Sequence, residues 1–149
     1  MAINTYSATL LKGTIESVKS IIPDSLDIMK PSIIQQSLLL VKLGVLIELS
    51  GTINGRIIID GNESTFSNIG EVMYGMSLQG ELLESFTGEL GNMIAGNLAT
   101  IAAIEGIQMD ITPPALLNNY SHKFHFNSAL SVPLYFATVG SFTIILMLE

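Results

Sequence analysis

A row of large apolar side chains at steps of three and four residues is the feature that most constrains how this chain folds. The row consists of Leu83, Phe86, Leu90, Ile94, Leu98 and Ile101. This spacing places all of them on one side of an α-helix. We therefore expect one long helix over 78–106, beginning after a break at 76–80, with this side packed on the core.

A second stripe on the same predicted helix is polar or small. It consists of Ser85, Glu89, Asn92 and Gly96, which are neighbours because helical residues three and four apart adjoin. We expect these four about a third of a turn from the apolar row, at its edge or beyond it, open to a partner. A chain with only 13% charged residues does not need a carboxylate and an amide there to fold. The alternative is an exposed pair that bonds to itself or to water.

Three glycines interrupt this helix, and each costs about 1 kcal/mol relative to alanine. They are Gly88, Gly91 and Gly96. One interpretation is close packing of the helix on a sheet. The other applies to Gly96, which lies on the polar stripe and would let the backbone of another protein come near.

Composition bounds the class of protein. The 149 residues are expected to form a single domain, 1–149, and 48% of them are hydrophobic. This apolar content indicates either a large core or a buried subunit interface. No apolar run is long enough to cross a bilayer, and the N-terminus does not resemble a signal peptide. The chain has no cysteine, which excludes disulfides and thiolate chemistry and fits a cytoplasmic protein.

The charge pattern argues against nucleic acid as a partner. The net charge is −7, and the only basic residues are Lys12, Lys19, Lys30, Lys42, Arg56 and Lys123. They are scattered, so no run of phosphates would be neutralised.

Local patterns predict the remaining elements in the order helix, strands, helix, helix, strands. The predicted ranges are a helix over 8–21 stopped by Pro23, strands over 38–49 and 53–59, a helix over 63–74 ending at Gly75, and strands over 107–111, 120–127, 130–138 and 142–148, the last two joined by a turn at 139–141. Strands joined by short turns predict an antiparallel sheet with helices packed on it, an α+β fold.

Each half of the chain is predicted to be a long helix followed by strands, which is typical of an internal duplication. When the first long helix is laid on the second, Glu16 falls on Glu89 and Lys19 falls where Asn92 stands.

The polar stripe and its flanks resemble a known family, the CheC/CheX chemotaxis phosphatases. The matching segments are Glu89-Leu-Gly-Asn92-Met-Ile-Ala-Gly96-Asn97 with Ser85 before it, Pro114 in Thr-Pro-Pro-Ala after it, and Met73-Tyr-Gly75 upstream. The resemblance implies an antiparallel sheet with long helices and internal pseudo-symmetry. Because Lys19 replaces the amide in the first helix, only one Glu-x-x-Asn site remains, and the chain is nearer to CheX than to CheC.

The resemblance also implies hydrolysis of the aspartyl-phosphate on a CheY-like response regulator. Asn92 would orient the attacking water, because a carboxamide both accepts and donates hydrogen bonds and is not a base. Glu89 would grip the regulator's active-site lysine, and Ser85 and Gly96 would shape the contact edge. Mg²⁺ would belong to the regulator, with no cofactor in this chain. Members nearer to CheX are homodimers joined through their sheets.

Two other functions stay open from sequence. One is a module that docks receivers without hydrolysing anything, and the other is a dimeric structural domain whose Glu/Asn stripe is incidental. His122 and His125 offer a weak metal pair, but on a strand they would point to opposite faces, so we expect no metal site there.

Overall fold

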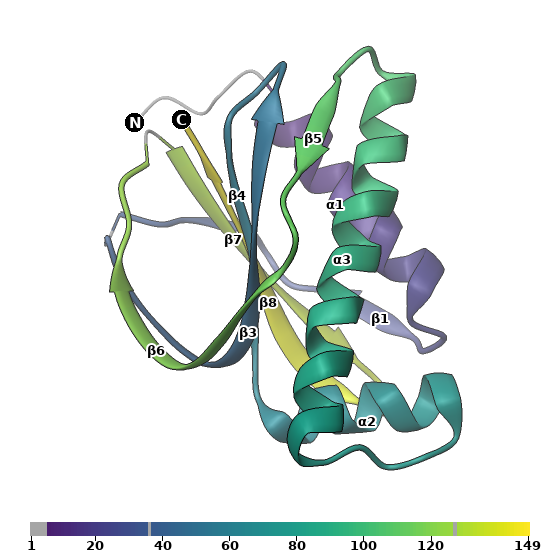
Figure 1. Cartoon of the computed structure of the whole chain (residues 1–149). Helices are drawn as coiled ribbons and strands as arrows, with labels where there is room; N and C mark the ends of the chain where they lie inside the picture. Colours follow the sequence, from purple (N-terminus) through teal and green to yellow (C-terminus); the bar gives the residue numbers. More distant parts are fainter. Residues whose placement is uncertain (1–5, 36, 127) are drawn as a thin grey trace.

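The computed structural model describes residues 6–35, 37–126 and 128–149. In this part of the chain, three helices cover one face of an eight-stranded sheet (Figure 1). The elements are α1 Ser7–Ile21, β1 Leu26–Ile28, β2 Ser32–Ile33, β3 Leu38–Gly51, β4 Gly55–Gly61, α2 Glu63–Tyr74, α3 Gly80–Ile104, β5 Met109–Ile111, β6 Ala115–Lys123, β7 Ser128–Phe136 and β8 Gly140–Leu148. The expected α+β class and order of elements are confirmed.

The pairing of the strands shows the internal duplication. The order across the sheet is β1-β7-β8-β4-β3-β5, with β2 also on β7 and β6 also on β3, and every pair is antiparallel. If each of β1 to β4 is exchanged with its counterpart among β5 to β8, the result is the same strand order read from the opposite edge of the sheet. The two halves are therefore related by a pseudo-twofold axis, with α1 as the counterpart of α3. Each half keeps its own hairpin, β3–β4 or β7–β8, but its other two strands pair with the hairpin of the other half.

The apolar row of α3 packs as the sequence predicts. Leu83, Phe86, Leu90, Ile94 and Leu98 are buried, and Ile101 is half-buried. They join a core between the helices and the sheet. A second, smaller core lies on the opposite face of the sheet, where Leu117 and Phe124 pack with Val41, Ile58 and Ile145.

Helix α2 has the predicted bounds because both of its ends are encoded locally. Asn62 caps the first turn by accepting a hydrogen bond from the Thr65 amide at 2.9 Å. Gly75 ends the helix with a φ of 74°, a left-handed conformation that glycine adopts without strain.

The bounds of β6 correct the prediction of a strand over 120–127. The strand begins at Ala115 and ends at Lys123, and residue 127 lies outside the described residues. The pair Asn118-Asn119 is typical of a turn. Pairing with β3 overrides that preference, and Asn119 takes a φ of 47° within the strand.

Strands β4 and β5 begin two residues later than expected. The segments that precede them contact each other. The Gln108 amide donates to Thr52 Oγ1 at 3.0 Å, and the Thr52 amide donates to the Gln108 carbonyl at 2.9 Å. Because the two residues are 56 positions apart, no local sequence pattern predicts these hydrogen bonds.

The turn between β7 and β8 lies at 137–139, earlier than the predicted 139–141. The Asp24 carboxylate holds it by accepting from the backbone amides of Thr138 at 2.9 Å and Val139 at 3.1 Å. These bonds lower the pKa of Asp24, the Thr138 bond most of all. The short strands β1 and β2, which both pair with β7, were not predicted. Two or three residues are too few to show the alternation of apolar and polar side chains that marks a strand.

Candidate functional site

The polar stripe lies on the solvent side of α3, facing away from the sheet. Ser85 and Glu89 are exposed, whereas Asn92 and Gly96 are half-buried. Figure 1 shows α3 as the long helix running along the surface of the sheet, with α1 beside it. The stripe is therefore open to a visiting protein along several turns of one helix.

Helix α3 packs closely against strand β3 and helix α1. A Cβ added to Gly91 would lie 2.7 Å from Val45 Cγ1, so the missing side chain is what lets α3 approach β3. On the α1 side, Ser17 Oγ donates to the Ile94 carbonyl at 2.8 Å. Close packing is therefore the role of Gly91. Gly96 differs, because an added Cβ there would meet no atom within 4 Å.

The side chains of Glu89 and Asn92 are uncommitted. Within 6–35, 37–126 and 128–149, neither makes a hydrogen bond or ion pair with another residue. Asn97, further along the same helix, contrasts with this, because its amide donates to Ser20 Oγ at 2.7 Å. Asn92 thus keeps both its donor and its acceptor available to a ligand.

The loop before β6 forms one wall beside the stripe. The Pro114 ring lies 3.9 Å from the position of a Cβ added at Gly88, which adjoins Asn92 one turn along α3. Nearby, the Asn118 amide donates to the Glu84 carboxylate at 3.1 Å. The proline of the sequence motif is therefore brought to the stripe. The Asn118–Glu84 contact was not foreseen, since nothing local links residues 34 positions apart.

Helices α2 and α3 carry only negative formal charges, and Lys42 of β3 lines a cavity together with Glu63 at the start of α2. No lysine or arginine occurs between Arg56 and Lys123. The same stretch carries Asp60, Glu63, Glu71, Glu81, Glu84, Glu89, Glu105 and Asp110. A partner that docks on α2 or α3 must therefore tolerate or neutralise negative charge.

The corresponding face of α1 does not repeat the site. Glu16 and Lys19 are both exposed there. A lysine supplies charge but no acceptor, so it does not replace the carboxamide of Asn92.

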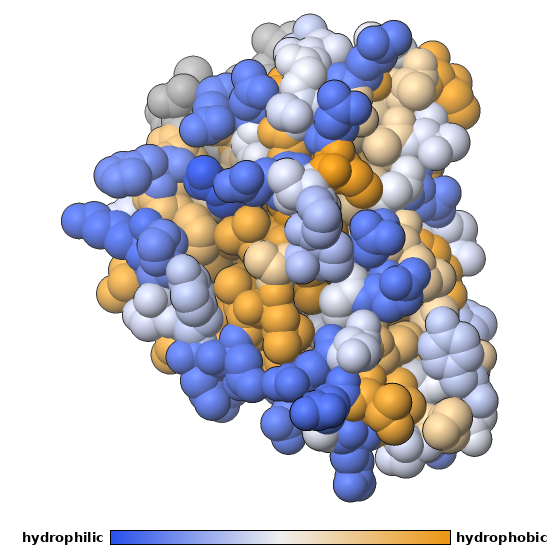
Figure 2. All heavy atoms as spheres, viewed as in Figure 1, coloured by the Kyte–Doolittle hydropathy of each residue, from blue (hydrophilic) through white to orange (hydrophobic). Residues whose placement is uncertain are grey.

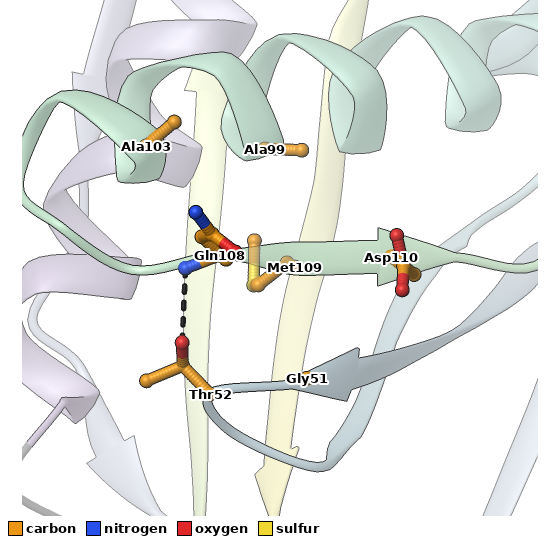
Figure 3. A pocket seen from close by; sticks show the side chains of 7 residues that line it. All are labelled: Gly51, Thr52, Ala99, Ala103, Gln108, Met109 and Asp110. Atoms are coloured by element: carbon orange, nitrogen blue, oxygen red, sulfur yellow. Dashed lines mark hydrogen bonds between the residues drawn. The ribbon is translucent and has the colours of Figure 1, made fainter.

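Two cavities of the described chain each have a single titratable side chain in their lining. One of about 440 Å³ lies beside the C-terminal half of α3, and Figure 3 shows Ala99 and Ala103 on one side of it and Thr52 on the other. Asp110 is the only titratable residue that lines it. Another, of about 320 Å³, is lined by Asn68, Glu71, Val72 and Thr138.

Within the described residues, no cluster of three or more histidine, aspartate or glutamate side chains is suited to a metal. The His122 ring instead packs between the rings of Tyr120 and Phe124, with centroid separations of 5.4 and 4.7 Å. In the same described part, no helix is both long enough and apolar enough to cross a membrane.

Known proteins share this fold. A crystal structure of chemotaxis protein CheX from Desulfovibrio desulfuricans superposes with a TM-score of 0.81 at 15% identity, covering 98% of this chain and 100% of that one. The CheX-CheY-BeF₃-Mg²⁺ complex from Borrelia burgdorferi gives a TM-score of 0.76 at 22% identity, with 97% of each chain covered. The architecture is therefore that of the CheC-like chemotaxis proteins.

Comparison of the amino-acid sequence with known families identifies the family within this fold class. The profile of the family described as chemotaxis phosphatase CheX matches residues 43–136. The CheY-P phosphatase CheX of Thermotoga maritima is 33% identical over 135 residues, covering 85% of this chain and 87% of that protein. The chain belongs to the CheX family of chemotaxis phosphatases.

Proposed function

We propose that this protein hydrolyses the aspartyl-phosphate of a phosphorylated CheY-like response regulator. The observation that carries the proposal is the uncommitted, solvent-facing amide of Asn92, one helical turn from the exposed carboxylate of Glu89. The T. maritima relative is named a CheY-P phosphatase, and the B. burgdorferi neighbour was crystallised with CheY. Both agree with the activity proposed.

Asn92 is assigned to orientation of the attacking water. Its amide oxygen accepts a hydrogen bond from water, and its neutral charge avoids repelling the phosphoryl oxygens. Water attacks phosphorus, the bond between phosphorus and the aspartyl oxygen breaks, and inorganic phosphate leaves while the regulator's carboxylate is restored. Positioning supplies much of the catalysis of such transfers. Mg²⁺ on the partner would neutralise phosphoryl charge, and this chain contributes none of its own.

Glu89 is assigned to docking. Its carboxylate would pair with the active-site lysine of the regulator and so fix the register in which Asn92 meets the phosphoryl group. Ser85 and Gly96 lie a turn to either side and shape the edge of contact. The absence of any atom near an added Cβ at Gly96 leaves room for a partner's backbone.

The test is the decay of a phosphorylated receiver with and without this protein. The proposal predicts a shortened half-life and stoichiometric release of phosphate. A protein that binds the phosphorylated receiver but leaves its half-life unchanged is a docking module. A protein that binds no receiver has only a structural role, and either result overturns the phosphatase.

We also propose that the protein is a homodimer joined through the free edge of β6. Among the described strands, β6 pairs only with β3, and such a long open edge invites pairing with another chain. Leu38 and Leu40 on neighbouring β3 are 62% and 65% exposed. Figure 2 shows hydrophobic side chains gathered over the β3 and β6 region, with hydrophilic ones around them.

Light scattering coupled to gel filtration tests the dimer. Leu40→Glu is expected to give a folded monomer, because the charge would be buried at the interface. Ile104→Glu, an equally drastic change on α3, should remain dimeric. A monomeric wild type, or a Leu40→Glu variant that stays dimeric, contradicts this interface.

We further propose that residues 1–149 act as one domain in the cytoplasm. The strand pairing supports the first part, because the outer strands of each half pair with the hairpin of the other half. The lack of cysteine agrees with the second.

A further inference from the structure

An apolar surface lies at the junction of α2 and α3, next to the polar stripe. Tyr74, Met76 and Leu82 are 56%, 53% and 63% exposed, and together we call them the shoulder. Figure 2 shows hydrophobic side chains at the surface over the junction that Figure 1 places at the start of α3. Large side chains with this much exposure in one place are typical of an interaction surface.

The shoulder is continuous with the candidate catalytic stripe. Leu82 adjoins Phe86 one turn along α3, and the Tyr74 ring meets the Phe86 ring edge-on with centroids 5.7 Å apart. Leu82 also precedes Ser85 by three residues and Glu89 by seven, which places all three on the same side of the helix. A protein that reaches Glu89 therefore comes up against Leu82.

The shoulder is held in shape before any partner arrives. Ser67 Oγ donates to the Leu78 carbonyl at 3.0 Å, which ties the connection between α2 and α3 back to α2. Leu78 is buried, and an added Cβ at Gly70 would lie 2.5 Å from Leu78 Cδ1. A preformed surface loses little entropy on binding.

The charges around the shoulder indicate the chemistry of its partner. Glu71, Glu81 and Glu89 are exposed on the same two helices, which carry no lysine or arginine. A second copy of this chain, with a net charge of −7, would bring like charges together. The complementary partner is apolar where it meets Leu82 and basic around that point.

We propose that the shoulder is the contact that sets affinity for the receiver whose phosphoryl group the Glu89/Asn92 site removes. It takes the part of the receiver beside the phosphorylated aspartate, where an apolar side chain is framed by lysine or arginine. This inference rests on the proposed phosphatase function. It adds a docking surface that the Glu-x-x-Asn motif does not contain.

The test compares Leu82→Ala with Ile104→Ala. Both residues are exposed on α3, 63% and 81%, and they lie about 15 and 18 Å from Asn92 along the axis in opposite directions. For each variant, kcat and KM are measured for phosphate release, and Kd is measured for the receiver activated with BeF₃⁻ and Mg²⁺. Thermal unfolding checks that both variants fold.

Leu82→Ala is expected to raise KM and Kd about tenfold, with kcat within twofold of wild type. Ile104→Ala should leave both KM and Kd unchanged. Raising the salt concentration should raise the KM of the wild type, because charges frame the contact. Unchanged KM and Kd for Leu82→Ala, or equal effects of the two variants, would overturn the docking role of the shoulder. If the wild type is active in the same assay, the proposed phosphatase function still stands. A wild type that accelerates no receiver's dephosphorylation defeats both proposals.

Discussion

At the scale of single residues, Glu89 and Asn92 differ from nearby polar residues in their hydrogen bonding. The Asn97 amide donates to Ser20 on α1, and the Glu84 carboxylate accepts from Asn118 on β6. The side chains of Glu89 and Asn92 make no hydrogen bond or ion pair in the described chain. The sequence predicted both the position and the exposure of the pair, because helical spacing is a local property. It did not predict the contact of Asn118 with Glu84 beside the pair, which joins residues distant in sequence.

Reversing the charge of Glu89 tests its docking role. Glu89→Lys is expected to raise KM for the phosphorylated receiver about tenfold or more, since a charge-assisted bond contributes roughly 1.5–3 kcal/mol. Glu105→Lys makes the same change in net charge at the far end of α3 and should leave KM near that of wild type. Equal effects of the two variants would show that only net charge matters.

At the scale of elements, the glycines of α3 have opposite roles. Gly91 is buried against Val45, whose branched side chain has little freedom to move away. Gly96 faces open space, so nothing in the fold itself requires glycine there. The sequence set Gly96 apart by its place on the polar stripe, but only the docked sheet shows that Gly91 is the glycine that close packing requires.

Alanine at these two positions should shift stability in opposite directions. Gly91→Ala is expected to lower the free energy of unfolding by about 1 kcal/mol, because overpacking outweighs the gain in helix propensity. Gly96→Ala is expected to raise it by about 1 kcal/mol and to raise KM if a partner's backbone approaches there. Urea unfolding measures both, and a Gly91→Ala protein as stable as Gly96→Ala would refute the packing argument.

At the scale of the molecule, the sequence predicted the α+β class, the order of elements and the duplication, because periodicity and turn residues are local. It misplaced β6 and omitted β1 and β2, whose positions depend on pairing with β3 and β7 across the sheet. The palindromic strand order explains why α1 and α3 lie side by side.

The sheet carries a carboxyl group whose ionisation opposes folding. Burial raises the pKa of Asp60 on β4 to about 6, above its unfolded value of about 4. The folded protein therefore binds more protons than the unfolded chain between these values, and stability falls as pH rises from about 4 to 6. Asp60→Asn is expected to stabilise the protein by about 1 kcal/mol at pH 8, allowing for solvent screening, and by nothing below pH 4. A pH-independent gain in thermal unfolding would contradict this.

The central claim is that the amide of Asn92 aims water at the phosphoryl group of another protein. The most direct measurement is phosphate release from a phosphorylated receiver by Asn92→Ala beside Asn97→Ala, an equal truncation on the same helix. We predict that Asn92→Ala loses at least about 100-fold in kcat while its Kd for the BeF₃⁻-activated receiver stays within threefold of wild type, and that Asn97→Ala remains active. An Asn92→Ala protein that releases phosphate at the wild-type rate would contradict the account.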